Sequence, residues 1–225
     1  MKNWLAGATR LISIHRSELL AGILIVQMIS SPLADARPHL GAVLALIVLL
    51  LILAATTYEG NQRIVRRVAL PLTGLWLIAR FLEACFPSCD RCAHISPVAG
   101  LALSCAILWA IHDHFSSASR FSRGLIADAL ISYLVIAIAF SQLYWILSRF
   151  IDRPFNQYVP ITQSSTYLYF SMITLSGVGY GGIVPINPYI RLIAAVENIV
   201  GIFYVAVVVA RFVASYSSRA PEEMR

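Results

Sequence analysis

The chain has 225 residues, of which 59% are hydrophobic and only 12% are charged. Soluble globular domains carry about 25% charged residues, so the composition excludes an ordinary soluble domain and favours a polytopic helical membrane protein. The net charge of +6 comes from basic residues dispersed over short polar stretches, which argues against a nucleic-acid-binding surface.

Six apolar stretches lie between these polar stretches, and we predict that each forms a helix crossing a hydrocarbon core about 30 Å thick. They cover residues 11–29, 40–57, 68–86, 97–111, 125–147 and 189–214. Residues 1–16, which alternate apolar and polar side chains, are predicted to lie along the inner interface, as are residues 112–123. The N-terminal stretch has no clear cleavage site of a signal peptide.

The positions of lysine and arginine predict how these helices are oriented, because cytoplasmic loops carry an excess of positive charge. Eleven basic residues fall on one side, namely Lys2, Arg10, Arg16, Arg63, Arg66, Arg67, Arg120, Arg123, Arg211, Arg219 and Arg225. Five fall on the other side, namely Arg37, Arg91, Arg149, Arg153 and Arg191. We therefore expect a multi-pass protein of a prokaryotic plasma membrane with both termini in the cytoplasm.

Two features of the first four spans bear on their role. Arg80 and Glu83 are three residues apart within the third span, so on a helix they share a face and can pair. The fourth span contains neither lysine nor arginine. A voltage sensor needs several such charges, so the sequence predicts weak voltage dependence.

Three cysteines cluster in the predicted outer loop between the third and fourth spans: Cys85, Cys89 and Cys92. Their spacing leaves three interpretations open, which are a metal site completed by His94, a disulfide on an oxidising face, and a structural or incidental role. The last interpretation is favoured, because no other fourth ligand is apparent.

The segment between the fifth and last spans differs from all of these. Residues 161–175 are polar and aromatic, and the segment is too short to cross the membrane. It leads into T-L-S-G-V-G-Y-G-G-I-V-P, from Thr174 to Pro185. Irregular backbone at membrane depth is tolerated where protein buries it or where it lines a watery path, and its carbonyl oxygens can replace the water shell of a cation. We therefore predict a re-entrant helix followed by an extended loop.

These residues resemble the pore region of potassium channels. The resemblance rests on Y-F-S-M-I-T-L at 169–175, V-G-Y-G at 178–181 and I-V-P at 183–185. Residues 195–201 and 203–211 resemble the inner helix of the bacterial ion-channel family whose pore domain has two transmembrane helices. The resemblance covers residues 125–214, whereas the first four spans agree only in number with six-helix tetrameric channels.

The resemblance implies three parts: a four-helix membrane domain at 1–123 in the position of a voltage sensor, a pore domain at 124–216 and a short tail at 217–225. It also implies an all-α integral membrane fold and a filter that holds K⁺ rather than any cofactor. Since each chain carries one such loop without an internal repeat, the pore requires a homo-oligomer, by resemblance a homotetramer among membrane lipids.

The site residues fall into three groups under this resemblance. The carbonyls of the filter would bind monovalent cations at Gly177, Val178, Gly179 and Tyr180, with Gly181 completing the loop. Alternating glycines permit dihedrals that turn successive carbonyls one way, with Val178 and Tyr180 pointing outward to brace the strand. Filter support is assigned to Tyr169, Thr174, Ser176, Gly182 and Glu197, and the cavity and gate to Asn198, Gly201, Ile202, Val205, Val209 and Val213.

Several of these assignments have a second interpretation. Glu197 would lie in the ion path, brace the filter or be an ordinary hydrogen-bonded carboxyl group. Gly201 would be a hinge or a site of close helix packing. The valine ring would close the pore by dewetting or simply pack.

The filter departs from the family at two positions. Gly177 stands where the family has threonine, and Gly182 stands where it has aspartate. Potassium selectivity is therefore one hypothesis, and a weakly selective monovalent cation channel is the other. A Gly177→Thr change is expected to tighten selectivity if the missing hydroxyl is the cause of weak selectivity.

A third hypothesis is a non-conducting membrane scaffold or transporter subunit. An enzyme is not expected, since no nucleophile–base pair or phosphate loop is evident. Residues 215–225 are too few for a ligand-binding gating domain, so the sequence does not indicate the stimulus that opens the pore.

Overall fold

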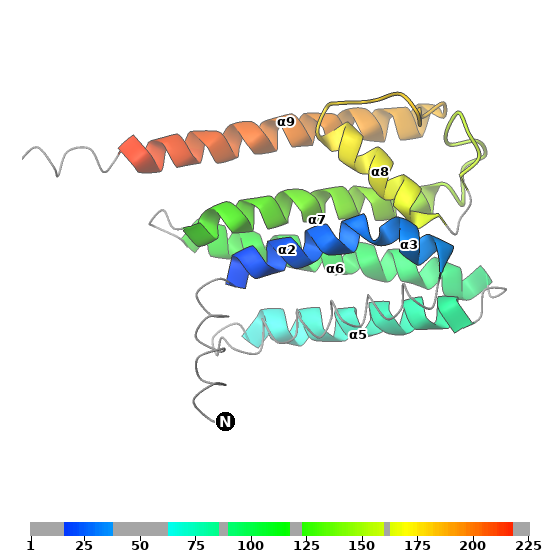
Figure 1. Cartoon of the computed structure of the whole chain (residues 1–225), viewed down its shortest axis with the longest axis horizontal. Coiled ribbons are helices and arrows are strands. Elements are labelled where there is room, and N and C mark those ends of the chain that lie inside the picture. Colours follow the sequence, from blue (N-terminus) through cyan, green and yellow to red (C-terminus); the bar gives the residue numbers. More distant parts are fainter. Residues whose placement is uncertain (1–15, 38–62, 86–89, 118–122, 160–162, 218–225) are drawn as a thin grey trace, which may run out of the picture.

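The computed structural model describes residues 16–37, 63–85, 90–117, 123–159 and 163–217 (Figure 1). The regular secondary structure in this part of the chain is helical, and one isolated bridge joins Phe155 and Pro185 in the loops before and after α8. The helices are α2 (Arg16–Ile29), α3 (Ser31–Ala36), α5 (Arg63–Cys85), α6 (Asp90–Ser117), α7 (Arg123–Leu147), α8 (Ser164–Leu175) and α9 (Pro188–Ser217).

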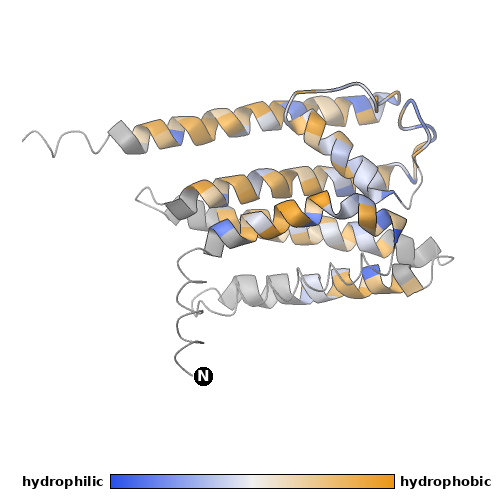
Figure 2. Ribbon diagram, in the orientation of Figure 1, coloured by the Kyte–Doolittle hydropathy of each residue, from blue (hydrophilic) through white to orange (hydrophobic). Residues whose placement is uncertain are grey.

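Two of these helices are long and apolar enough to cross a membrane. They contain the stretches Ile126–Leu147 in α7 and Pro188–Ala214 in α9, of 22 and 27 residues. Shorter apolar stretches occur at Leu20–Ile29, Pro71–Leu82 and Ile95–Trp109. Figure 2 shows the hydrophobic colouring along α7 and α9. The predicted second span, 40–57, lies outside the described residues, so the prediction of six spans stays a prediction.

The helices pack in an order that places α7 at the centre. On one side of it lie α2 and α6, with α5 packed beyond on α6 (Figure 1). On the other side α8 crosses obliquely between α7 and α9. Near the N-terminal part of α7 the Tyr204 hydroxyl of α9 donates to the carbonyl of Ala129 at 2.6 Å. The short helix α8 is thus held between the two long apolar helices.

The helix that contains the fourth predicted span is longer than the span itself. The span was expected at 97–111, close to the apolar stretch Ile95–Trp109, whereas α6 begins at Asp90 and continues to Ser117. Hydropathy marks only the apolar middle of a helix, whereas backbone hydrogen bonding continues through polar flanks into the interface. The predicted outer loop is shorter for the same reason: Cys85 is the last residue of α5 and Cys92 lies in α6, while Cys89 is outside the described residues.

The first predicted span and α2 both end at Ile29, and the short helix α3, which was not predicted, follows. The Ser30 and Ser31 hydroxyls donate to the carbonyls of Gln27 and Met28, at 3.0 and 2.8 Å. Pro32 then lies in the first turn of α3, where a missing N–H costs nothing. Serine back-bonding and an early proline thus lie at the break between α2 and α3.

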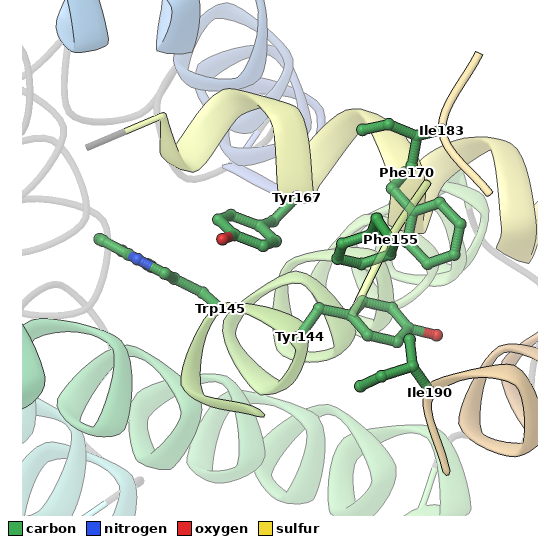
Figure 3. Close-up of a cluster of buried hydrophobic side chains, with 7 residues drawn as sticks. All are labelled: Tyr144, Trp145, Phe155, Tyr167, Phe170, Ile183 and Ile190. Atoms are coloured by element: carbon green, nitrogen blue, oxygen red, sulfur yellow. The ribbon is translucent and has the colours of Figure 1, made fainter. Parts of the chain in front are cut away.

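A cluster of buried side chains joins α7, the loop after it, α8 and the start of α9 (Figure 3). Its members are Tyr144, Trp145, Phe155, Tyr167, Phe170, Ile183 and Ile190. The Phe170 ring meets Tyr144 and Phe155 edge-on, with centroids 4.9 Å apart in both pairs. Such pairs add about 0.5–1.5 kcal/mol each beyond area burial. This cluster fixes α8 and the chain that follows the glycine loop.

Candidate functional site

The C-terminal end of α8 holds the start of the glycine loop by backbone hydrogen bonds. The Ser176 N–H donates to the Met172 carbonyl and the Gly177 N–H to that of Thr174, both at 3.1 Å. The Gly179 N–H reaches back to the Ile173 carbonyl, also at 3.1 Å. The last carbonyls of α8 are thereby satisfied by the loop itself, which fixes where the loop leaves the helix.

Three glycines of the loop have left-handed backbone conformations. Their φ angles are 73° at Gly177, 53° at Gly179 and 79° at Gly181. Residues with a Cβ adopt such angles at a cost, so glycine is favoured at these three positions. The alternation of these glycines with Val178 and Tyr180 is the pattern that the sequence led us to expect for a filter strand.

The angle at Gly177 changes one expectation. A threonine there would place a β-branched side chain at a φ of 73°, and its Cβ would lie 3.3 Å from the Asn198 amide nitrogen. For β-branched residues such a φ is a strained outlier. A Gly177→Thr change is therefore expected to distort the loop rather than to tighten its selectivity.

The side chains between the glycines are exposed in the single chain. Val178 is 53% and Tyr180 74% exposed. Both side chains are therefore largely uncovered in the single chain, and the bracing predicted for them stays a prediction. An open hollow lies between the loop and the helices α8 and α9, and it is lined in part by Gly179, Ile173 and Asn198.

Glu197 of α9 is fully buried. Its carboxylate accepts hydrogen bonds from the Tyr144 hydroxyl at 2.6 Å and the Ser171 hydroxyl at 2.5 Å. Ser171 Oγ also lies 2.7 Å from the Ala137 carbonyl. One carboxyl group thus links α9 to α7 and α8. This geometry favours bracing over a place in the ion path, because no face of Glu197 is open in the single chain.

The hydroxyl partners of Glu197 were not singled out from the sequence. Tyr144 lies in an apolar helix, and Ser171 lies in the pore-helix stretch. A buried carboxyl group in a membrane protein requires donors. A search of the other helices for donors to Glu197 could therefore have pointed to Tyr144 and Ser171.

Asn198 and Gly201 join α9 to the end of α8. The Asn198 amide donates to the Thr174 carbonyl at 2.9 Å, so it serves the helix end rather than only an ion cavity. A Cβ built on Gly201 would lie 1.9 Å from the Leu175 carbonyl oxygen. Close packing of α9 against the end of α8 therefore explains why glycine stands at position 201, and the role of Gly201 as a hinge stays a prediction.

The remaining predicted residues are more exposed. Tyr169 is 44% exposed and borders an open groove between α8 and α3, which Gly182 also borders. Ser176 is exposed, with its hydroxyl 3.4 Å from the Ile173 carbonyl. On α9 the four predicted gate residues are 50–64% exposed, and they are Ile202, Val205, Val209 and Val213. Their roles stay predictions.

The structure describes only some of the residues in two predictions about the N-terminal helices, the Arg80–Glu83 pair and the cysteine cluster. The Arg80 guanidinium lies over the Trp145 ring, 5.9 Å from its centroid, while the side chain of Glu83 lies outside the description. Cys85 and Cys105 are free cysteines, and in the residues that the structure describes no three His, Cys, Asp or Glu side chains form a group able to hold a metal. Cys89 and the side chain of Cys92 lie outside the description, so the prediction about the cysteine cluster stays a prediction.

Residues 129–218 match the model of a protein family described as ion channel, whose pore domain has two transmembrane helices. The match includes most of α7, all of α8, the glycine loop and α9. Neither the curated proteins nor the solved structures provide a match. The family match and the apolar helices support an ion channel in a membrane, and they suggest a function other than catalysis.

Proposed function

We propose that this protein is a passive potassium channel. The carbonyls of Gly177, Val178, Gly179 and Tyr180 would replace the hydration shell of K⁺. The observation that carries the proposal is the loop backbone: left-handed glycines alternate with other residues while the end of α8 fixes the start of the loop. The C-terminal end of α8 also carries a partial negative charge, which favours cations nearby.

The proposed assembly is a homotetramer. One chain supplies one loop, and a ring of carbonyls requires several copies around an axis. The exposed side chains of Val178 and Tyr180 lie on this loop, where neighbouring copies would cover them. Only 11% of the apolar stretch of α9 is buried, which leaves a long face for lipid and for other copies.

A weakly selective monovalent cation channel is the second candidate. It is favoured by Gly177 and Gly182, which lack the hydroxyl and carboxylate that the family pattern carries at these positions. Both candidates share the proposed tetramer, the plasma membrane and cytoplasmic termini, so they differ only in the ratio of K⁺ to Na⁺ permeability.

The decisive experiment is single-channel recording of the purified protein in planar bilayers with K⁺ on one side and Na⁺ on the other. A reversal potential displaced strongly towards that of K⁺ supports the potassium channel, and one near zero supports the weakly selective channel. A matched pair of variants tests the loop. Gly179→Ala, at a φ of 53°, is expected to abolish conduction, whereas Gly74→Ala, with open space in α5, is expected to conduct normally. A folded wild-type protein without ion flux would favour a scaffold or transporter subunit.

A further inference from the structure

The N-terminal end of α8 is capped by a residue from a distant part of the chain. Asp35 of α3 accepts hydrogen bonds through both carboxylate oxygens. Its Oδ1 accepts from the Ser164 N–H at 3.2 Å and the Ser164 hydroxyl at 2.8 Å. Its Oδ2 accepts from the Ser165 N–H at 2.8 Å. Gln163, the residue at the N-cap position, makes no side-chain capping bond. The capping of α8 is therefore tertiary rather than local.

This contact has two physical effects on α8. The first N–H groups of a helix have no partner within it, and a carboxylate satisfies two of them here. Its charge also lies beside the partly positive end of the helix dipole. Both effects favour one position of the first turn of α8 relative to α3.

The position of Asp35 is itself determined by packing and by the break between α2 and α3. Ala21 of α2 packs with Ile131 and Val135 of α7 in a buried cluster. The serine hydroxyl bonds at Ser30 and Ser31 lie at the break between α2 and α3, and α3 packs against α8, where Asp35 reaches the end of that helix. The contact thus connects the N-terminal helices to α8 through a defined route.

The opposite end of α8 carries the glycine loop. Its Thr174 carbonyl accepts from the Gly177 N–H and from the Asn198 amide, and its Ile173 carbonyl accepts from the Gly179 N–H. Twelve helical residues span about 18 Å, so a shift of the first turn is transmitted to the loop by a rigid rod.

We infer that Asp35 is a positioning residue for the pore: through it, the α2–α3 segment sets the place of α8 and thereby the conducting geometry of the glycine loop. This inference rests on the proposed channel function. It gives the N-terminal helices a role in ion permeation that does not require voltage-sensing charges.

Four variants test the inference in single-channel recordings. Asp35→Ala removes the cap, and we expect the open probability to fall about fivefold, which corresponds to the loss of an ordinary cap. Asp35→Asn keeps one amide oxygen as acceptor, so we expect a smaller decrease in open probability. Ser164→Ala loses only the side-chain bond, so we expect the smallest decrease in open probability of the three. Asp152→Asn makes the same chemical change at an exposed loop residue and is expected to match the wild type.

A merely structural contact would lower the yield or thermal stability of the assembly and leave open probability and permeability ratio unchanged in the channels that fold. Unchanged recordings from folded Asp35→Ala would therefore overturn the inference. If this variant does not fold, unchanged recordings from Asp35→Asn together with Ser164→Ala would overturn it instead.

A second measurement separates this inference from the proposed function. If the wild type does not conduct, hydrogen exchange at the first-turn amides of α8 still tests the contact. We expect faster exchange at Ser164 and Ser165 in Asp35→Asn than in Asp152→Asn. Equal exchange in both would show that Asp35 does not position α8.

Discussion

Buried polar side chains hold the site together at the scale of single residues. Glu197 is fully buried in α9, and it accepts from Tyr144 and Ser171 on two other helices. Interhelical hydrogen bonds in membranes contribute about 0.6 kcal/mol on average, and bonds to charged groups contribute more. A carboxyl group served by two hydroxyls belongs at the upper end of that range. We therefore regard this triad as the strongest polar link between α7, α8 and α9 in the described chain.

Removing one hydroxyl from this triad tests that view. Tyr144→Phe leaves Glu197 with one donor, so we expect the free energy of unfolding to fall by about 1–2 kcal/mol. Tyr133→Phe is the matched control on the same helix, because the Tyr133 ring packs against Tyr204 with centroids 5.6 Å apart. Thermal or detergent-induced unfolding of the purified protein measures the stability of both variants. Equal stability of the two variants would show that the Glu197 hydrogen bond contributes little.

Close approach of helices determines the geometry at the scale of elements. The end of α8 comes so near to α9 that a Cβ on Gly201 would overlap the Leu175 carbonyl. Backbone cannot yield as the tip of a flexible side chain does, so α9 must move if Gly201 is replaced. The aromatic cluster that joins α7, α8 and the start of α9 opposes such a movement.

A pair of glycine substitutions tests this contact. Gly201→Ala is expected to destabilise the protein by about 1–3 kcal/mol through overpacking and to lower ion conduction as α8 shifts. Gly22→Ala in α2 has no atom within 4 Å of its new Cβ, and it is expected to be neutral or slightly stabilising. Thermal stability and liposome ion flux measure both variants. A Gly201→Ala protein as stable and as active as Gly22→Ala would refute the packing argument.

The whole molecule is organised around α7. The N-terminal helices pack on one side of α7, and α8 with α9 lies on the other (Figure 1). The family match begins at residue 129 and so excludes the N-terminal helices. Several contacts nonetheless connect them to the matched part, among them the Ala21 cluster on α7, the Arg80 guanidinium over the Trp145 ring and the Asp35 cap on α8.

This organisation bears on the response to voltage. The helix α6 carries Arg91 near its start and has no other arginine or lysine through Ser117. Voltage sensors move 3–4 charges per subunit. We expect the open probability to change little with voltage. The effective gating charge that moves through the membrane field should be below about one elementary charge per subunit. Recordings in planar bilayers between negative and positive potentials measure this slope, and a steep relation would contradict the prediction.

Much of the local structure could be predicted from the sequence. Composition and long apolar runs predicted α7 and α9, because the need to satisfy backbone groups in lipid leaves few alternatives. The glycine run predicted the left-handed angles, because only residues without a Cβ adopt them at little cost. The polar ends of α6 and the short helix α3 were missed, because hydropathy does not report helical hydrogen bonds that continue into polar sequence.

The amino-acid sequence by itself determined the membrane class, the glycine loop and the positions at which that loop can bend. Only the tertiary structure decided which groups meet: Glu197 with Tyr144 and Ser171, Gly201 with the Leu175 carbonyl, and Asp35 with the start of α8. The physical reason is the separation along the chain of the residues that interact. Backbone conformation and apolar patterning depend on neighbours along the chain, whereas these contacts join residues up to 130 positions apart and depend on how the helices pack.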